Sequence, residues 1–173
     1  EVSNGMICGQ DELNLGEFDQ GIMILDDKYK SGTLLKDIFK VDSDWVYDIG
    51  LTPNRADAMS HYGTARDLRA RLLHEGKTIE LKTPSVSNFI VDKRTKKIMI
   101  NIEDESITKR YCGIVIENIK VENSPLWLQN KLNTIGITPI NNIVDITNYV
   151  MYDIGQPLHA FDYDKIEGNA INV

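Results

Sequence analysis

Cysteine and histidine are scarce in this 173-residue sequence, which holds two cysteines and three histidines. Cys8 and Cys112 lie far apart and form no CxxC pair, so we expect no disulfide framework and a reducing, cytoplasmic setting. The histidines show neither HExxH nor another metal-ligand spacing: His61, His74 and His159. The sequence therefore predicts no metal site.

Long apolar runs and glycine-rich nucleotide loops are also missing. No run approaches the ~20 residues that span a bilayer, and no charged-then-apolar leader opens the chain, so we expect no membrane partner. The patterns GxxxxGK[ST], GxGxxG and GxSxG are absent, which argues against nucleotide loops and hydrolase elbows. We therefore expect these residues to hold no cofactor. The first residue is Glu1 rather than Met, from which we expect an excised fragment.

Basic residues are outnumbered, with 19 Lys and Arg against 26 Asp and Glu and a net charge of −7. Neutralising the phosphates of a nucleic acid needs a surplus of Lys and Arg, so the chain as a whole is not expected to bind nucleic acid on its own. Apolar residues make up 42% and charged residues 26%, which is typical of globular proteins. The length allows one ordinary domain or two small ones.

The first half of the chain predicts short strands followed by one helix. Residues 1–44 combine apolar pieces with frequent glycines, a pattern of strands and turns. Residues 45–51 predict another strand, and a helix follows near 55–74, with Thr52-Pro53-Asn54 as its start signal. We expect the arginines of this helix to lie on solvated or salt-bridged faces.

The second half predicts three strands and then two helices. The strands are expected at Phe89–Val91, Ile98–Ile102 and Tyr111–Ile119, and the last has the strongest signal because it is rich in β-branched apolar residues. The first helix should follow a cap at Ser124, directly before Pro125. The second should begin near Asn141 or Asn142 and end before Gly155. These patterns predict an α+β protein of small mixed sheet-and-helix modules.

The densest basic cluster is Lys93-Arg94-Thr95-Lys96-Lys97. Two interpretations stay open for it. It is either a hairpin tip that touches RNA phosphate or an exposed turn that keeps a sheet edge soluble.

Residues 139–162 interleave amides, a hydroxyl, a carboxylate and an imidazole with apolar side chains. On a helix, Asp145 and Asn148 share a face, Thr147 adjoins them, and His159 returns after the following turn. Such groups are suited to orienting an ester carbonyl or a ribose hydroxyl and to positioning water. They are also suited to a buried polar network that pins a helix to a loop, and both interpretations stay open.

Two ordered blocks of residues carry a resemblance to a known family. The blocks are Thr52–Asp57 with Gly63–Leu68, and Ser124–Leu128 with Asn141–Val150 and Gly155–Asp162. The first resembles the signature of the β subunit of bacterial phenylalanyl-tRNA synthetases. The second resembles the start of the same subunit's editing module.

The resemblance implies an internal fragment made of three parts. Residues 1–44 would be the C-terminal tail of an OB-type, tRNA-binding-like domain. Residues 45–85 would form a small α/β module around the helix near 55–74. Residues 86–173 would be the N-terminal portion of the editing domain, which hydrolyses mischarged aminoacyl-tRNA.

The resemblance also implies an activity and partners. Such synthetases are (αβ)₂ enzymes that join phenylalanine to its tRNA with ATP and Mg²⁺, and their β subunit hydrolyses mischarged Tyr-tRNA. The implied partners are the α subunit and tRNA. Thr147, Asn148 and His159 match editing-site motifs, with the implied roles of holding the aminoacyl ester and terminal adenosine and positioning water. The fragment alone is expected to be inactive in aminoacylation and to edit poorly.

Two alternatives to a hydrolytic segment remain. In the first, the chain is a structural and tRNA-docking segment without catalytic residues, in which Asn54, Arg55, Asp57 and Arg66 make interdomain hydrogen bonds. In the second, it is a free-standing aminoacyl-tRNA deacylase. The block Asn54–Leu68 argues against the second alternative, because it resembles the synthetase subunit outside the editing module.

Overall fold

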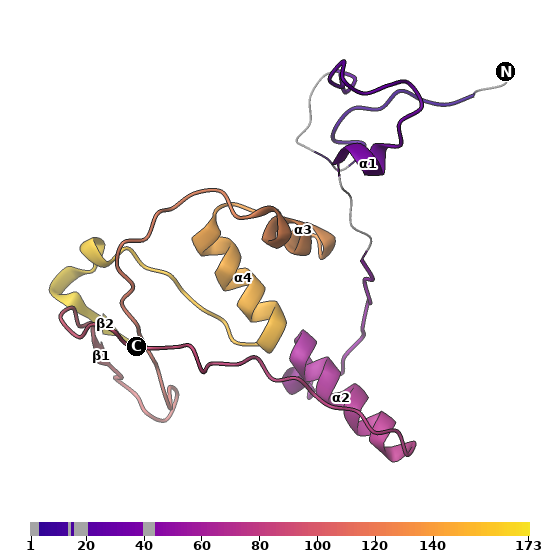
Figure 1. The fold of residues 1–173 in the computed structure, drawn as a ribbon. Coiled ribbons are helices and arrows are strands. Elements are labelled where there is room, and N and C mark those ends of the chain that lie inside the picture. Colours follow the sequence, from indigo (N-terminus) through magenta and orange to yellow (C-terminus); the bar gives the residue numbers. More distant parts are fainter. Residues whose placement is uncertain (1–3, 14, 16–20, 40–43) are drawn as a thin grey trace. The chain divides into compact units, whose positions relative to one another are not determined.

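A computed structural model describes residues 4–13, 15, 21–39 and 44–173 (Figure 1). The chain divides into two compact units, Glu1–Trp45 and Val46–Val173, which are described separately. Parts of the strand-rich tail expected at residues 1–44 lie outside the described residues. The assignment of that tail to an OB-type domain, and the three-part division as a whole, stay predictions.

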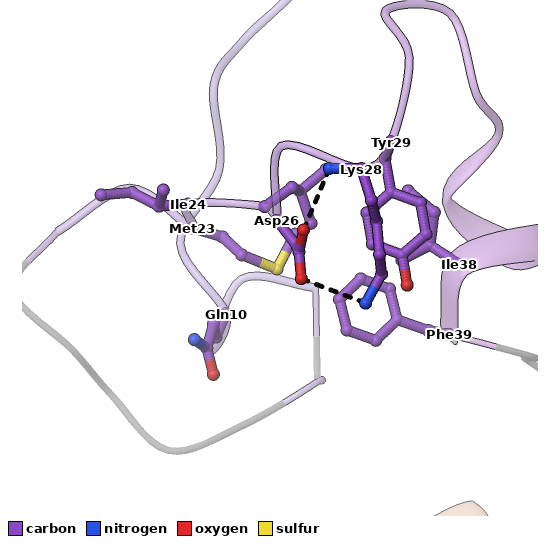
Figure 2. A pocket seen from close by; sticks show the side chains of 9 residues that line it. Gln10, Met23, Ile24, Asp26, Lys28, Tyr29, Ile38 and Phe39 are labelled. Atoms are coloured by element: carbon purple, nitrogen blue, oxygen red, sulfur yellow. Dashed lines mark hydrogen bonds and ion pairs between the residues drawn. The ribbon is translucent and has the colours of Figure 1, made fainter.

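The described residues of the first unit form turns and one short helix, α1 (Leu35–Phe39). Residues 21–25, which lie within the expected pattern of strands and turns, form no strand; Met23 donates one backbone hydrogen bond to Cys8 O (3.1 Å) and no ladder follows in the described part of the unit. An open cavity of about 290 Å³ lies here (Figure 2). Asp26 and Lys28 border it, and the hydrogen bond from Lys28 N (3.0 Å) together with the ion pair to Lys28 Nζ (3.1 Å) lowers the pKa of the Asp26 carboxyl.

The second unit opens with a 3₁₀ turn, η1 (Ala56–Ala58), and the helix α2 (His61–His74). The helix begins later than the expected residue 55 because Ser60 is extended and is the N-cap, its hydroxyl accepting from Gly63 N (2.9 Å). The expected start signal serves a turn instead, since the Thr52 hydroxyl bonds to the Asn54 side chain (2.6 Å). The end at His74 agrees with the sequence pattern.

The two helices expected in the second half are confirmed as α3 (Leu126–Thr134) and α4 (Asn142–Ile154). Asn141 caps the start of α4, and Gly155 ends it in the left-handed region (φ 78°), a conformation that favours glycine. α3 packs against α4, which also contacts α2 (Figure 1). Leu128 and Leu132 of α3 are fully buried, so the core of this unit lies at the α3–α4 contact.

One small sheet confirms part of the strand prediction. β1 (Met99–Asn101) lies within the expected strand at 98–102 and pairs in parallel with β2 (Ala170–Asn172), which the sequence analysis missed. Together with the helices, this sheet confirms the α+β class. Two short 3₁₀ turns precede β2, η2 (Tyr163–Lys165) and η3 (Glu167–Asn169).

The strands expected at 45–51, 89–91 and 111–119 are not formed. The last segment lies against β1 through side chains, since a Cβ at Gly113 would come within 2.9 Å of Ile100 Cδ1. Its backbone nevertheless has no ladder partner among the described residues. β-propensity measures how well a residue fits a paired, half-buried surface, and it forms no strand without a neighbour.

Within the described ranges, no helix is long and apolar enough to cross a membrane.

Candidate functional site

Asp145, in the first turn of α4, is fully buried and structural. Its carboxylate accepts from Ser124 Oγ (2.5 Å) and from Ile140 N (2.8 Å). Ser124 therefore does not cap α3 as expected; Pro125 is the N-cap and makes no side-chain bond there. A buried carboxylate requires such donors, and here they tie the start of α4 to the segment that precedes α3.

The two asparagines at the start of α4 complete this network. Asn141 Oδ1 accepts from Ile143 N and Val144 N, each at 3.0 Å. The Asn142 amide donates to Lys120 O (2.9 Å) and accepts from Glu122 N (3.3 Å). These amides hold backbone groups, so this part of residues 139–162 is the polar network that pins a helix to its neighbouring segment.

The three residues matched to the editing site have different surroundings. The Thr147 hydroxyl donates to Val144 O (2.6 Å), one turn back along α4. Asn148 follows it and is half-buried, and its side chain makes no hydrogen bond to another residue in the described part of the chain. No hydrogen bond among the described residues joins either of them to His159. The structure thus places Thr147 and Asn148 side by side on α4 and His159 in the loop beyond.

His159 is exposed in the loop that follows α4. Its ring stacks on Phe161, with centroids 4.3 Å apart and planes at 28°. Directly after Phe161, Asp162 caps η2, its carboxylate accepting from Asp164 N (3.2 Å). The stack orients the imidazole while both ring nitrogens make no hydrogen bond to a described residue, so they are available to water or a ligand.

The residues at 55–67 form an exposed ion network around the start of α2. Arg55 contacts Asp57 (3.0 Å) and Asp67 (2.5 Å), and Arg66 donates to the Asp57 carboxylate (2.7 Å). The hydrogen bond from Arg55 lowers the pKa of Asp57, and these carboxylates raise the pKa of Arg55. The prediction of salt-bridged arginines is confirmed. The network holds the η1 turn on α2, which is a structural role.

Two glycines make close contacts around this ion network. A Cβ at Gly63 would come within 2.4 Å of Asp57 O, so only glycine lets α2 approach the η1 turn this closely. A Cβ at Gly155 would lie 3.4 Å from Ser60, the cap of α2. The end of α4 therefore lies against the start of α2, and the two sequence blocks meet at this point (Figure 1).

Lys93, Arg94, Lys96 and Lys97, here called the basic bend, lie exposed at a bend before β1. The hairpin of one of the two interpretations is not formed, because residues 89–91 form no strand. Glu117 contacts Lys96 (3.4 Å) and, more distantly, Lys93 (4.0 Å).

Comparison with known proteins covers nearly the whole chain. Residues 107–173 match the family of B3/4 domains. The chain is 48% identical over 171 residues to the phenylalanine–tRNA ligase β subunit of Bacteroides fragilis, spanning 99% of this chain and 21% of that protein. It is 42% identical to the β subunit of Salinibacter ruber, spanning 100% of this chain and 21% of that protein. It is 40% identical to the β subunit of Fusobacterium nucleatum, spanning 96% of this chain and 20% of that protein.

Over nearly its whole length the chain is similar to phenylalanine–tRNA ligase β subunits. This confirms the resemblance carried by the two sequence blocks. The chain spans about a fifth of the length of the relatives it matches. The B3/4 match begins at residue 107, so it contains all three residues assigned to the editing site.

Sequence reasoning missed three contacts in this chain. Ser124 carries a helix-cap signal that hides its bond to Asp145. Asp67 lies within the family block, yet its pairing with Arg55 crosses twelve residues. Glu117 sits in an apolar segment that predicts a strand, with no local sign of its basic partners. Each contact joins segments that are distant in sequence, which periodicity does not detect.

Proposed function

We propose that this chain works as part of a phenylalanine–tRNA ligase β subunit and that residues 107–173 contribute to hydrolysis of mischarged Tyr-tRNA. The identity of 40–48% to β subunits across the chain supports the first statement. The whole protein would support ATP-dependent charging of tRNA with phenylalanine in an (αβ)₂ assembly in the cytoplasm. ATP and Mg²⁺ are assigned to the aminoacylation site of the α subunit, so the isolated chain should not aminoacylate.

One observation carries the hydrolytic role. Most polar side chains at the start of α4 are committed to backbone or buried partners, whereas the side chains of Asn148 and His159 make no hydrogen bond to any described residue. An exposed imidazole is suited to position or deprotonate an attacking water. A free amide is suited to hold an ester carbonyl or a ribose hydroxyl. Thr147 is a supporting residue, because its hydroxyl already donates to α4.

A separate hydrolytic site has a physical rationale. Tyrosine differs from phenylalanine by one hydroxyl, and an apolar pocket rejects such an addition only by about 10²-fold in a comparable case. A polar site that satisfies the tyrosyl hydroxyl inverts this preference, because phenylalanine leaves its groups unpaired. Hydrolysis after charging therefore raises accuracy beyond what the first pocket achieves.

The test uses the intact αβ enzyme and preformed Tyr-tRNA that carries the phenylalanine anticodon. His159→Ala and Asn148→Ala should each slow deacylation by about 10²-fold while charging with phenylalanine is retained. His74→Ala is the matched control, since His74 is an exposed histidine at the end of α2. Deacylation at the wild-type rate in both site variants would contradict the hydrolytic role and favour a structural one.

A structural and tRNA-docking role is the second candidate. The buried Asp145 network and the ion pairs of Arg55 favour it, because these family residues hold the fold together. In the same assay, this candidate predicts that His159→Ala deacylates Tyr-tRNA at the wild-type rate. The free-standing deacylase is less well supported, since residues ahead of the B3/4 match also align with β subunits.

A further inference from the structure

The basic bend lies next to the loop that carries His159. The Tyr163 hydroxyl donates to Lys97 O (3.3 Å), and the Tyr163 ring lies 5.2 Å from Lys96 Nζ in a cation–π contact. Tyr163 is only four residues beyond His159, although it is 66 residues from Lys97. The fold therefore holds the densest basic cluster of the sequence at the end of the candidate hydrolytic loop.

The four cations of the basic bend differ in their pairing. Lys96 and Lys93 share a single carboxylate, Glu117, at 3.4 and 4.0 Å. Arg94 and Lys97 have no acidic partner among the residues that the structure describes, and both are exposed. One carboxylate does not neutralise four cations, so a local positive charge remains on a chain whose net charge is −7.

We propose that the basic bend contacts the phosphate backbone of the tRNA whose aminoacyl end is presented to His159, and that Glu117 limits the strength of this contact. The inference rests on the hydrolytic role proposed above. Lys and Arg contact phosphates without reading sequence, and such contacts set the position of a nucleic acid on a protein. Because the rest of the chain is negatively charged, the attraction for tRNA phosphates is confined to the basic bend. The tRNA backbone is thereby held beside the loop that carries His159.

Glu117 competes with phosphate for the same cations. When a phosphate binds Lys96 and Lys93, their ion pairs with Glu117 are exchanged for contacts with the nucleic acid. Removing the carboxylate therefore frees two cations for phosphate, whereas reversing Arg94 and Lys97 removes the unpaired ones. The two changes should alter affinity in opposite directions, which a merely solvated bend does not predict.

The experiment measures the Kd of the intact αβ enzyme for its tRNA between about 50 and 200 mM salt, by fluorescence anisotropy. Arg94→Glu with Lys97→Glu should weaken binding about tenfold at the lower salt and reduce the slope of log K against log salt by about 1 to 2. Glu117→Gln should tighten binding about twofold or more. Arg94→Lys with Lys97→Arg keeps the charge and should retain wild-type affinity.

A second pair of substitutions is the matched control. Arg71→Glu with Lys77→Glu makes the same charge change at the end of α2, where both residues pair with Glu75. An equal loss of affinity in this control would overturn the inference, as would an unchanged Kd and salt slope after reversal of Arg94 and Lys97. An unchanged Kd in Glu117→Gln would overturn the role given to Glu117.

Failure of this inference is distinguishable from failure of the hydrolytic role. The basic bend acts on binding, so its reversal should raise the KM for Tyr-tRNA deacylation and leave the single-turnover rate at saturating enzyme unchanged. His159→Ala should show the opposite pattern, a slower single-turnover rate with an unchanged tRNA Kd. If His159→Ala deacylates normally but the bend variants still lose affinity, the hydrolytic role fails while the phosphate contact stands.

Discussion

Ser124 and Asp145 lie 21 residues apart and form a buried hydrogen bond of 2.5 Å between the segment before α3 and the first turn of α4. This bond identifies Asp145 as a structural polar group among residues 139–162. Because Asp145 is committed to the fold, it does not belong to the candidate hydrolytic site. Asn148, one turn further along α4, makes no comparable bond among the described residues and stays available.

Asp145→Ala should lower the free energy of unfolding by about 3 kcal/mol, since it leaves the buried Ser124 hydroxyl and the Ile140 N–H without an acceptor. Urea denaturation followed by Trp127 fluorescence in a Trp45→Phe background measures this. Trp127 is a suitable probe because it packs edge-on against Tyr149 of α4 (5.6 Å).

Asp153→Ala is the control for Asp145→Ala, because Asp153 is another aspartate of α4 and its side chain makes no hydrogen bond within the described residues. It should change stability by less than about 0.5 kcal/mol. An equal loss of unfolding free energy in the two variants would show that the buried hydrogen bonds of Asp145 make no particular contribution to stability.

Asn141→Ala should cost about 1 kcal/mol of stability, because the Asn141 side chain accepts from two of the free N–H groups at the start of α4. Asn141→Asp retains the acceptor and should retain stability. The same urea titration measures both variants. A loss in the aspartate variant as large as that in the alanine variant contradicts the capping role.

Gly63→Ala should destabilise the chain by about 2 kcal/mol or more, although alanine ordinarily favours a helix over glycine by up to about 1 kcal/mol. The added Cβ would come within 2.4 Å of Asp57 O and force the η1 turn away from α2. Gly50→Ala is the control, since no atom lies within 4 Å of a Cβ at that position. A thermal melt by circular dichroism compares the two; a stabilised Gly63→Ala would contradict the close contact.

Asp57→Asn should destabilise the chain at pH 7 and not at low pH. Arg55 lowers the pKa of Asp57 below its ordinary value of 3.8, so the carboxylate contributes stability above that value. The contribution disappears as the pH falls through the lowered pKa of the folded state. The difference in unfolding midpoint between wild type and variant should therefore close from pH 7 to about pH 2.

Salt provides a further check on Asp57. Its ion pairs are exposed and are therefore screened by salt. At pH 7, 1 M salt should also reduce the difference in unfolding midpoint between wild type and Asp57→Asn. A difference that is independent of both pH and salt would show that the asparagine acts through packing rather than through charge.

Local signals predicted the helices better than the strands. The bounds of α4 follow from an asparagine cap and a terminal glycine, both satisfied within a few residues, and the structure places them as expected. The start of α2 was wrong because Thr52 and Asn54 bond to one another and Ser60 caps instead. The strand expected at 111–119 was wrong because a strand needs a neighbour, and a run of β-branched apolar residues does not supply one.

The resemblance to β subunits, the α+β class and the helices α3 and α4 follow from local signals, because ordered motifs, caps and periodic apolar residues act over short distances. Which polar groups are structural and which are free depends instead on how distant segments pack. Asp145 is held by Ser124, Lys96 by Glu117, and the Lys97 backbone by Tyr163. Those partners lie 21 to 66 residues away, and hydrogen bonds and ion pairs over such separations depend on how the helices and the sheet pack.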